Sequence, residues 1–534
     1  MRDGPSSGMG MGIDDLRWFE LFNRRGTRRD FLRAGGSAAA LIACGGALPA
    51  RRGDRTPRFR SDPFELGVAS GDPLPDGVVL WTRLGGASLA EAGTPTAPVP
   101  VRWEVAEDEA FSRMARSGES LAIPELGHSV HAEVDGLEPG RVYHYRFISG
   151  GAVSRVGRTR TAPPPGAPTD RLRFAFCSCQ NFEDGYYTAF RHMANEDLDL
   201  VVHLGDYIYE GGQNQRGARP HDGPEIFSLD QYRARYALYR TDLDLQAVHA
   251  GFAWTATWDD HDVDNNYAAG VPENDQAPEA FMLRRAAAYQ AYYEFMPLRR
   301  RSAPSGPEMS MYRTVAFGDL VSMKVLDTRQ YRDDQACGDR FKPDCEGRWG
   351  PDRTLLGQAQ EDWLLRGLHE SPARWNVLAQ QVMMAPLRNW DTEGRPTNSM
   401  DTWDGYPVAR QRVLDVFESV RNPVVLTGDI HSSWAGDLHL GDARSPVVGA
   451  ELVCSSISTN GDGYDVPAQD GFIEWNPHFK FHDERRGYVS CEVTPDRITA
   501  SFRALPYVRE PDAPLQTRGV LVVEEGRPGV VRDL

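Results

Sequence analysis

The chain has 534 residues, a 40% hydrophobic and 25% charged composition, and a formal net charge of -17. These values are ordinary for a globular protein with room for more than one domain. A folded body this acidic argues against nucleic acid or an anionic membrane surface as its partner. A phosphorylated substrate would therefore have to be attracted by local positive charge, such as a bound cation.

The first 50 residues have the features of an export signal. The sequence TRRDFL at residues 27–32 matches a twin-arginine pattern, and an Ala/Gly-rich segment follows at 34–43. That segment is too short and too polar to span a membrane. We therefore predict export by the twin-arginine machinery, to the periplasm, the extracellular space or the cell surface. LIAC resembles a lipoprotein box, which makes Cys44 a candidate for lipidation; ordinary cleavage near residues 48–50 is the alternative.

A small β domain is predicted next, after a basic, proline-containing linker at residues 51–62. Short runs with alternating apolar residues and turn signals indicate an antiparallel β-sandwich over residues 63–161. We expect this domain to have a packing role, with carbohydrate or cell-wall binding as the alternative. The proline-rich sequence at 162–170 predicts a stiff linker and a domain boundary.

Residues 171–534 are predicted to form the catalytic domain. Strand-like and helix-like segments alternate there, which is typical of an α/β fold with a mixed sheet. Short apolar runs end in clusters of Cys, Asp, His or Tyr at CSCQ, GDYIYE, WDDHDVDNN and TGDIHSSW, residues 177–180, 205–210, 258–266 and 427–434. Ligand sites in open α/β sheets lie at the carboxyl ends of strands, so we expect these clusters to meet in one metal site.

Several side chains in these clusters suit metal binding. Asp206 ends a β-strand pattern and could bridge two cations, and the phenolate of Tyr209 is a hard ligand suited to ferric iron. The alternatives are a helix N-cap for Asp206 and a packed aromatic ring for Tyr209. Asp429 and His431 are two residues apart, so both can face one site from extended chain.

Placing the acidic run WDDHD at a strand end costs free energy unless positive charge compensates its carboxylates. Asp260 and His261 lie among four consecutive titratable residues at a strand end, which cations would stabilise; an ordinary charged turn is the alternative. Cys179 precedes Gln180 at the end of another strand, and a thiol beside a metal is deprotonated. Cys177 is expected in the core.

The cysteines exclude several cofactor types. Seven are present, with no CxxC or CxxCH pattern, so zinc ribbons and c-type haem are unsupported. Cys337 and Cys345 are eight apart in a loop-like stretch, and we predict a disulfide between them in an exported protein. No Rossmann glycines, P-loop, HExxH or GxSxG sequence is present, so no nucleotide cofactor is expected.

Six motifs in order resemble the PhoD family of secreted alkaline phosphatases and phosphodiesterases, within the calcineurin-like metallophosphoesterases. They are SCQ, GDYIYE, WDDHDVDNN, LDTRQYR, WDGYP and GDIHSSW, and the resemblance extends to GVASGDP, LWTRL and the leader. It implies an αββα mixed-sheet sandwich preceded by a small antiparallel β-sandwich. It also implies hydrolysis of phosphate monoesters, diesters or both by a metal-activated hydroxide.

The resemblance further implies roles for single residues. A ferric ion would be held by Cys179, Asp206, Tyr209 and His431. Asp206 would bridge to one or two calcium ions bound by Asp260 and Asp429. His261 would lie beside the scissile ester as the catalytic residue.

Two further residues, Asn265 and Arg329, are candidates for binding substrate phosphate, although Arg329 could equally pair with a neighbouring carboxylate. Asp260 and Asp429 stand where many metallophosphoesterases have Asn and His, which favours calcium over zinc. Gln380 and Gln381 stand where a His is common, and whether either binds a metal is open at this point.

Two other functions are consistent with an exported chain of this kind: a non-hydrolytic redox iron protein and a cell-envelope binding protein. The absence of Rossmann glycines, a haem motif and cluster cysteines argues against the redox protein, and the dense, intact ligand set argues against a binding protein with a decayed site. The sequence leaves open the preference for monoesters or diesters, the natural substrate and the oligomeric state. Two long irregular stretches, residues 211–224 and 332–353, are candidate lids.

Overall fold

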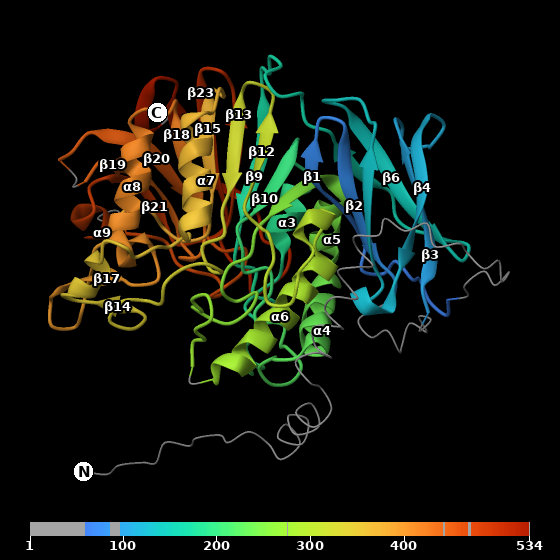
Figure 1. Cartoon of the computed structure of the whole chain (residues 1–534), viewed down its shortest axis with the longest axis horizontal. Helices are drawn as coiled ribbons and strands as arrows, with labels where there is room; N and C mark the ends of the chain where they lie inside the picture. Colours follow the sequence, from blue (N-terminus) through green and yellow to red (C-terminus); the bar gives the residue numbers. More distant parts are fainter. Residues whose placement is uncertain (1–58, 86–96, 275, 442–443, 468–470, 533–534) are drawn as a thin grey trace, which may run out of the picture. The chain divides into compact units, whose positions relative to one another are not determined.

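The computed structural model describes residues 59–85, 97–274, 276–441, 444–467 and 471–532 (Figure 1). The predicted export signal and Cys44 lie outside these residues, as does most of the predicted linker at 51–62. Within the described residues, no helix combines the length and the apolar character needed to cross a membrane.

Two large sheets form the catalytic part. The first has ten strands, in the order β25 (Arg527–Arg532), β24 (Gln516–Glu524), β23 (Arg497–Leu505), β22 (Arg486–Val493), β9 (Leu172–Cys177), β10 (Leu200–His203), β11 (Ala253–Ala256), β1 (Val68–Leu74), β2 (Gly77–Arg83) and β5 (Ser129–Asp135). The second has seven, in the order β12 (Arg313–Phe317), β13 (Val321–Val325), β15 (Trp375–Ala379), β18 (Pro423–Thr427), β20 (Val447–Val453), β19 (Ser433–His439) and β21 (Phe479–Asp483). Each sheet has a parallel centre, β9–β10–β11 in one and β13–β15–β18–β20 in the other.

Helices cover the outer face of each sheet. Those on the first sheet are α3 (Thr188–Met193), α4 (Leu229–Arg240), α5 (Leu243–Gly251) and α6 (Pro278–Phe295). Those on the second are α7 (Gln358–His369) and α8 (Pro407–Phe417), which Figure 1 shows in orange. Helix α4 begins with a capping box, in which Ser228 accepts from the N–H of Gln231 and Gln231 bonds back to Ser228.

Three apolar layers follow from this arrangement. Ala175 and Cys177 pack against the helices of the first sheet, while Phe174 and Phe176 pack between the two sheets. Side chains that alternate along β9 therefore serve two different layers, as the two-residue period of a strand requires. A third layer joins the second sheet to α7 and α8. The αββα mixed-sheet sandwich is confirmed, and Cys177 lies in the core as predicted.

The N-terminal β-sandwich is also confirmed, but one of its faces belongs to the catalytic sheet. A five-stranded sheet contains β3 (Val99–Ala106), β4 (Met114–Ala122), β6 (Val142–Ser149), β7 (Ala152–Val153) and β8 (Gly157–Arg160). It packs on β1, β2 and β5, and β1 in turn pairs with β11 in parallel. Gly71 of β1 has no room for a side chain, because a Cβ there would lie 2.2 Å from the carbonyl oxygen of Pro297 and 3.0 Å from that of Trp254 in β11. The sequence predicts the strands but not this partner, because pairing depends on residues far apart in the chain.

A small sheet lies in the region of the second candidate lid. It contains β14 (Phe341–Lys342), β16 (Asn389–Trp390) and β17 (Pro396–Ser399), and a disulfide joins Cys337 to Cys345 just beside β14. The first candidate lid, residues 211–224, is tied down by Glu183, whose carboxylate accepts from the N–H groups of Asn214 and His221.

Candidate active site

The four predicted clusters meet where strands of both sheets end. Cys179 follows β9, Asp206 follows β10, Asp260 follows β11 and Asp429 follows β18. Close approach of these loops depends on glycine: a Cβ on Gly205, whose φ is 113°, would lie 2.4 Å from the Cβ of Asp259. The expected convergence at the carboxyl ends of the strands is therefore present.

The backbone of the site is unusual. Cys179, Asp206, Asp429 and His431 all have left-handed backbone angles, with φ between 55° and 64°. Such conformations cost on the order of 1–3 kcal/mol each for residues other than glycine, and they persist only where the surroundings enforce them. All four are residues for which the sequence predicts metal binding.

Asp262 is one residue that enforces this conformation. Its carboxylate accepts hydrogen bonds from the backbone N–H of Asp206 at 2.9 Å, of Tyr207 at 3.1 Å and of Asp259 at 3.0 Å. It therefore fastens the loop after β10 to the loop after β11. Sequence reasoning gave Asp262 no role of its own, although it lies within WDDHD.

The predicted ferric ligands lie together. Ligand atoms of Cys179, Asp206 and His431 are all within 4.8 Å of one another. The phenol oxygen of Tyr209 is 3.0 Å from Oδ2 of Asp206 and 3.3 Å from Nε2 of His431. One thiol, one carboxyl, one phenol and one imidazole thus surround a common point.

Two further groups of ligand atoms adjoin the first. One contains Asp206, Asp260 and His261, and the other contains Asp259, Asp260 and Asp429. Asp206 and Asp260 therefore link all three groups. Asp259 was not among the predicted ligands, although it lies in the same motif.

Arg329 lies among these carboxylates rather than at the surface. Its side chain is 0% exposed. It donates to Asp259, and its Nη1 lies 2.8 Å from Asp401. Its Nη2 is 3.7 Å from Asp260 and 3.8 Å from Asp429. This position favours the ion-pair alternative that the sequence left open for Arg329.

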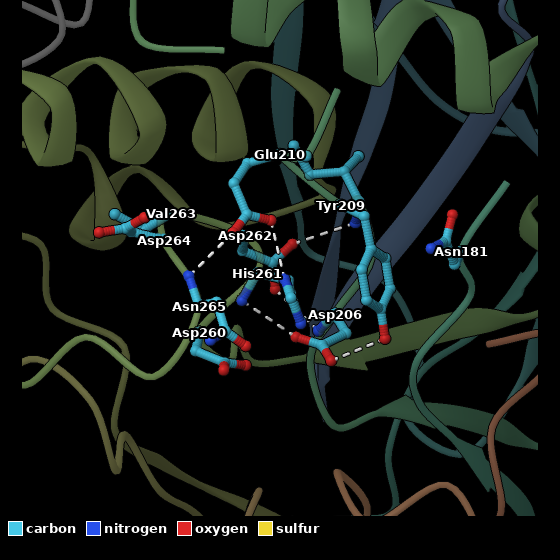
Figure 2. Close-up of polar contacts among 12 residues, drawn as sticks. Asn181, Asp206, Tyr209, Glu210, Asp260, His261, Asp262, Val263, Asp264 and Asn265 are labelled. Atoms are coloured by element: carbon cyan, nitrogen blue, oxygen red, sulfur yellow. Dashed lines mark hydrogen bonds and ion pairs between the residues drawn. The ribbon is translucent and has the colours of Figure 1, made fainter. Parts of the chain in front are cut away.

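His261 forms a pair with Glu210 (Figure 2). Its Nδ1 is 2.8 Å from Oε2 of Glu210, and its ring packs on Tyr209 with centroids 4.2 Å apart. Glu210 is buried, whereas His261 is 22% exposed, so the imidazole faces an accessible side of the site. The other oxygen of Glu210 accepts from the N–H of Asn265 at 2.8 Å. Glu210 closes the GDYIYE motif, but sequence reasoning assigned it no function.

Asn265, the other predicted phosphate-binding residue, already has a partner. Its side-chain amide donates to Oε1 of Glu273 at 2.7 Å. Gln380 and Gln381 are also engaged: Gln380 accepts from the indole of Trp403, and Gln381 accepts from the hydroxyl of Thr328. Neither glutamine belongs to a ligand group found among the described residues.

Burial and mutual repulsion decide the protonation of the acidic ligands. Burial raises the pKa of Asp206 and of Asp429 well above the usual range, and neighbouring aspartates raise it further. Burial, followed by the charge of Asp206, raises the pKa of the Cys179 thiol, and the same two causes raise that of the Tyr209 phenol. Burial lowers the pKa of His431 to about 3, so this imidazole is neutral and able to bind a metal.

The pKa values of His261 and Asp260 shift in the direction opposite to the one that burial alone would give. Burial alone would lower the pKa of His261, but the charges of Glu210, Asp260 and Asp206 outweigh it and raise the pKa. Burial would raise the pKa of Asp260, but Arg329 and then His261 outweigh it and lower the pKa. Asp260 is therefore charged, and His261 holds a proton above its ordinary pH range.

These residues fit cations. Among the described residues, Oδ2 of Asp259 and Oδ1 of Asp260 are buried without a hydrogen-bond partner, which is costly for carboxylate oxygens. Cations next to these oxygens would supply the missing partner, and they would displace protons from the thiol, phenol and carboxyl groups. The donor set of the site is therefore that of a metal centre.

Comparisons with known proteins show the family of the chain. Residues 174–502 match the family described as PhoD-like phosphatase, and residues 49–163 match its N-terminal domain. The chain is 50% identical over 531 residues to alkaline phosphatase D of Bacillus subtilis (strain 168), covering 97% of this chain and 91% of that one. A solved structure described as "Structure of PhoD" superposes with a TM-score of 0.87 at 52% identity, covering 90% of this chain and 93% of that one.

The matched family spans more than half of the chain, and the relatives match it along nearly their whole length. The chain therefore belongs to the PhoD-like phosphatase family and is a phosphoric ester hydrolase.

Proposed function

We propose that this phosphatase is an exported enzyme that uses a ferric ion and one or two calcium ions to hydrolyse phosphate monoesters, diesters or both. Cys179, Asp206, Tyr209 and His431 would hold the ferric ion. Asp206, Asp260 and Asp429 would hold calcium. The observation that supports this most directly is that Asp206 belongs to two ligand groups at once.

Ligand chemistry supports the two kinds of cation. Thiol, phenol and imidazole groups suit a transition metal, and Cys179, Tyr209 and His431 bring all three to one side of Asp206. His261 is the imidazole on the other side, where it shares a ligand group with Asp206 and Asp260. The other side offers carboxylates, with Asp259, Asp260 and Asp429 in one group. Hard oxygen ligands of this kind suit calcium.

When bound, the cations would withdraw charge from the phosphoryl oxygens and lower the pKa of the water that attacks phosphorus. The residues of the chain would position the substrate and protonate its leaving oxygen. Glu210 fixes one nitrogen of His261, so the other nitrogen remains to give its proton to the leaving oxygen. A His261 that keeps its proton is a poor metal ligand, which favours the acid role over a place in the metal shell.

Substrate phosphate would be held by Asn265 after its amide leaves Glu273. A phosphate dianion bound by the Asn265 amide would be repelled by the Glu273 carboxylate, so substrate binding would favour displacement of that carboxylate. Arg329, enclosed by carboxylates, would act on phosphate mainly by orienting Asp259 and Asp260.

Export by the twin-arginine route is supported by the TRRDFL pattern and the Ala/Gly-rich segment after it. The mature enzyme would then act outside the cytoplasm on small phosphate esters or on phosphodiesters of the cell envelope. Lipidation at Cys44 would tether it to a membrane surface.

The test is turnover of p-nitrophenyl phosphate and bis-p-nitrophenyl phosphate at alkaline pH by the purified exported protein. Each substrate is assayed before calcium chelation, after it, and after calcium is added back. We expect activity to fall with the chelator and return with calcium, and the ratio of the two rates to give the ester preference. Full activity in protein stripped of both iron and calcium would refute the metal-dependent proposal.

A further inference from the structure

One segment outside the predicted motifs contacts the proposed ferric site. Residues 456–460, SISTN, follow β20 and run beside the turn that carries Cys179. Ser178 and Ser456 form a parallel bridge, and the N–H of Ile457 donates to the carbonyl of Ser178 at 3.0 Å. The segment is therefore fixed against the loop after β9.

Thr459 is the member of this segment that reaches the ligands. Its side-chain oxygen, in a residue only 3% exposed, is 2.8 Å from the phenol oxygen of Tyr209 and 2.7 Å from the carbonyl oxygen of Cys179. The backbone N–H of Asn181 donates to the same hydroxyl at 3.1 Å. One buried hydroxyl thus contacts two residues proposed to bind the ferric ion.

The single proton of the Thr459 hydroxyl limits which hydrogen bonds it can donate. A threonine hydroxyl has one proton to donate and two lone pairs that accept, and the N–H of Asn181 occupies one of these. While Tyr209 keeps its phenol proton, it donates to Oδ2 of Asp206 at 3.0 Å, and the Thr459 hydroxyl lies within donating distance of both the Tyr209 oxygen and the Cys179 carbonyl. A phenol oxygen that binds a cation has no proton left, so the single Thr459 proton goes to the Tyr209 oxygen, and the Cys179 carbonyl keeps the backbone N–H of Thr459 at 3.4 Å.

We propose that Thr459 is a positioning residue of the ferric site, which donates a hydrogen bond to the oxygen of Tyr209 and limits the charge that this oxygen gives to the metal. This inference rests on the proposed function, because it takes Tyr209 as a ferric ligand. The neighbouring Asn460 has a parallel contact, since its side-chain amide lies 2.9 Å from Nδ1 of His431. Groups that hydrogen-bond to metal ligands in this way set ligand orientation and metal affinity.

The variants Thr459→Val, Thr459→Ser and Ser458→Ala test the proposal. Valine keeps the shape of threonine without the hydroxyl, and serine keeps the hydroxyl. Ser458→Ala is the matched control: in the described structure the Ser458 hydroxyl donates to the carbonyl of Asn181 at 2.7 Å and makes no hydrogen bond to Tyr209. Each full-length exported protein is loaded with ferric iron, and its iron content, circular dichroism and visible spectrum are recorded.

We expect the wild-type protein to show a visible band from charge transfer between the Tyr209 oxygen and iron. A donated hydrogen bond lowers the energy of the electrons on that oxygen, so its loss moves the band to longer wavelength. Thr459→Val should show this shift, and because Tyr209 then loses the contact that orients its oxygen, the variant should hold iron on the order of 10-fold more weakly. Thr459→Ser and Ser458→Ala should match the wild type in both.

Two results would overturn the proposal, and they differ. A folded, iron-loaded Thr459→Val protein with the wild-type band would refute the role of Thr459 alone. Iron-loaded wild type without any charge-transfer band would refute Tyr209 as a ligand, and with it both this inference and that part of the proposed function. Loss of iron from natively folded Thr459→Val, while Thr459→Ser retains it, would support the proposal.

Discussion

The charges of the groups on the two sides of Asp206 are compensated in different ways. On the side of Cys179 and Tyr209, Thr459 contacts the phenol, the buried guanidinium of Arg486 donates to the backbone carbonyl of His431, and burial raises the pKa of the thiol and the phenol. On the side of Asp260, the buried guanidinium of Arg329 already supplies positive charge. The comparison teaches that a guanidinium pairs directly with the carboxylates on the side of Asp260, whereas the guanidinium on the side of Cys179 contacts the site through the backbone carbonyl of His431.

Removing the carboxylate of Asp206, which both sides share, should abolish metal binding on both sides. Asp206→Ala takes a ligand from both sides, so we expect loss of iron and loss of calcium dependence. Turnover should fall about 1000-fold, which corresponds to three factors of ten at about 1.4 kcal/mol of lost transition-state stabilisation each. Metal analysis alongside p-nitrophenyl phosphate turnover measures this. Asp230→Ala, an exposed helix residue, is the control. An active Asp206→Ala enzyme with normal iron would contradict the bridging role.

Replacing the proposed acid should cost activity without emptying the site. His261→Gln removes a proton donor, and such donors contribute at least about 100-fold. Iron and calcium contents should stay at wild-type values, because His261 is proposed to protonate the leaving oxygen. His192→Gln, at a histidine that bonds the carbonyl of Ala513, serves as the control. Loss of calcium from His261→Gln would instead identify His261 as a metal ligand.

Arg329→Met should affect the side of Asp260 more than the side of Cys179. Leaving buried carboxylates unpaired costs about 3–5 kcal/mol of unfolding free energy. We expect added calcium to recover part of this loss, because it supplies the missing charge. Urea unfolding with and without calcium measures it, and Arg113→Met, at a largely exposed arginine, should change stability by less than about 0.5 kcal/mol. Equal losses with and without calcium would show that Arg329 does not share charge compensation with the metal.

The pH dependence of stability should differ between the metal-free protein and the protein loaded with calcium. Burial raises the pKa of Asp259 from 3.8 to about 7, although Arg329 offsets part of the rise. A carboxyl with a raised pKa binds its proton more tightly in the folded state, so metal-free protein should lose stability as pH rises from about 4 to 7. Calcium should remove this loss, since it favours the charged form. Thermal melts across that range, with and without calcium, would contradict the expectation if the two curves ran parallel.

Opening the disulfide should have the smallest effect, again on the side of Asp260. Asp339, between Cys337 and Cys345, accepts from the side chain of Asn266, whose N–H donates to Asp260 at 2.7 Å. The Cys337→Ser/Cys345→Ser variant should lose about 2 kcal/mol of stability at most and need more calcium for full activity. Its iron content should be unchanged. Loss of iron would show that the loop supports the whole site.

The sequence predicted the layers of the fold well because short apolar runs ending in polar clusters show where buried strands stop. Each of the four clusters follows a central strand, and Asp206, Asp260, Asp429 and His431 lie in them. Local pattern was sufficient here, since the geometry of an α/β sheet brings its strand ends together.

Other parts of the site could not be read from local pattern. Thr459 lies 250 positions from Tyr209, and nothing in SISTN distinguishes it from an ordinary loop. The place of Arg329 in the DTR run makes it a candidate for phosphate or for an ion pair, and only the three-dimensional arrangement reveals the aspartates around it. Glu210 and Asp262 lay within the motifs, but their partners come from other strands.

The parallel pairing of β1 with β11 has a consequence for dividing the chain. A fragment beginning after the proline-rich linker would lose β1, and the central strand β11 would become a sheet edge with unpaired N–H and C=O groups. Such bare edges recruit other strands and promote aggregation. The first hundred or so residues of the folded body thus cover an edge of the catalytic sheet, and the catalytic part should aggregate when it is produced without them.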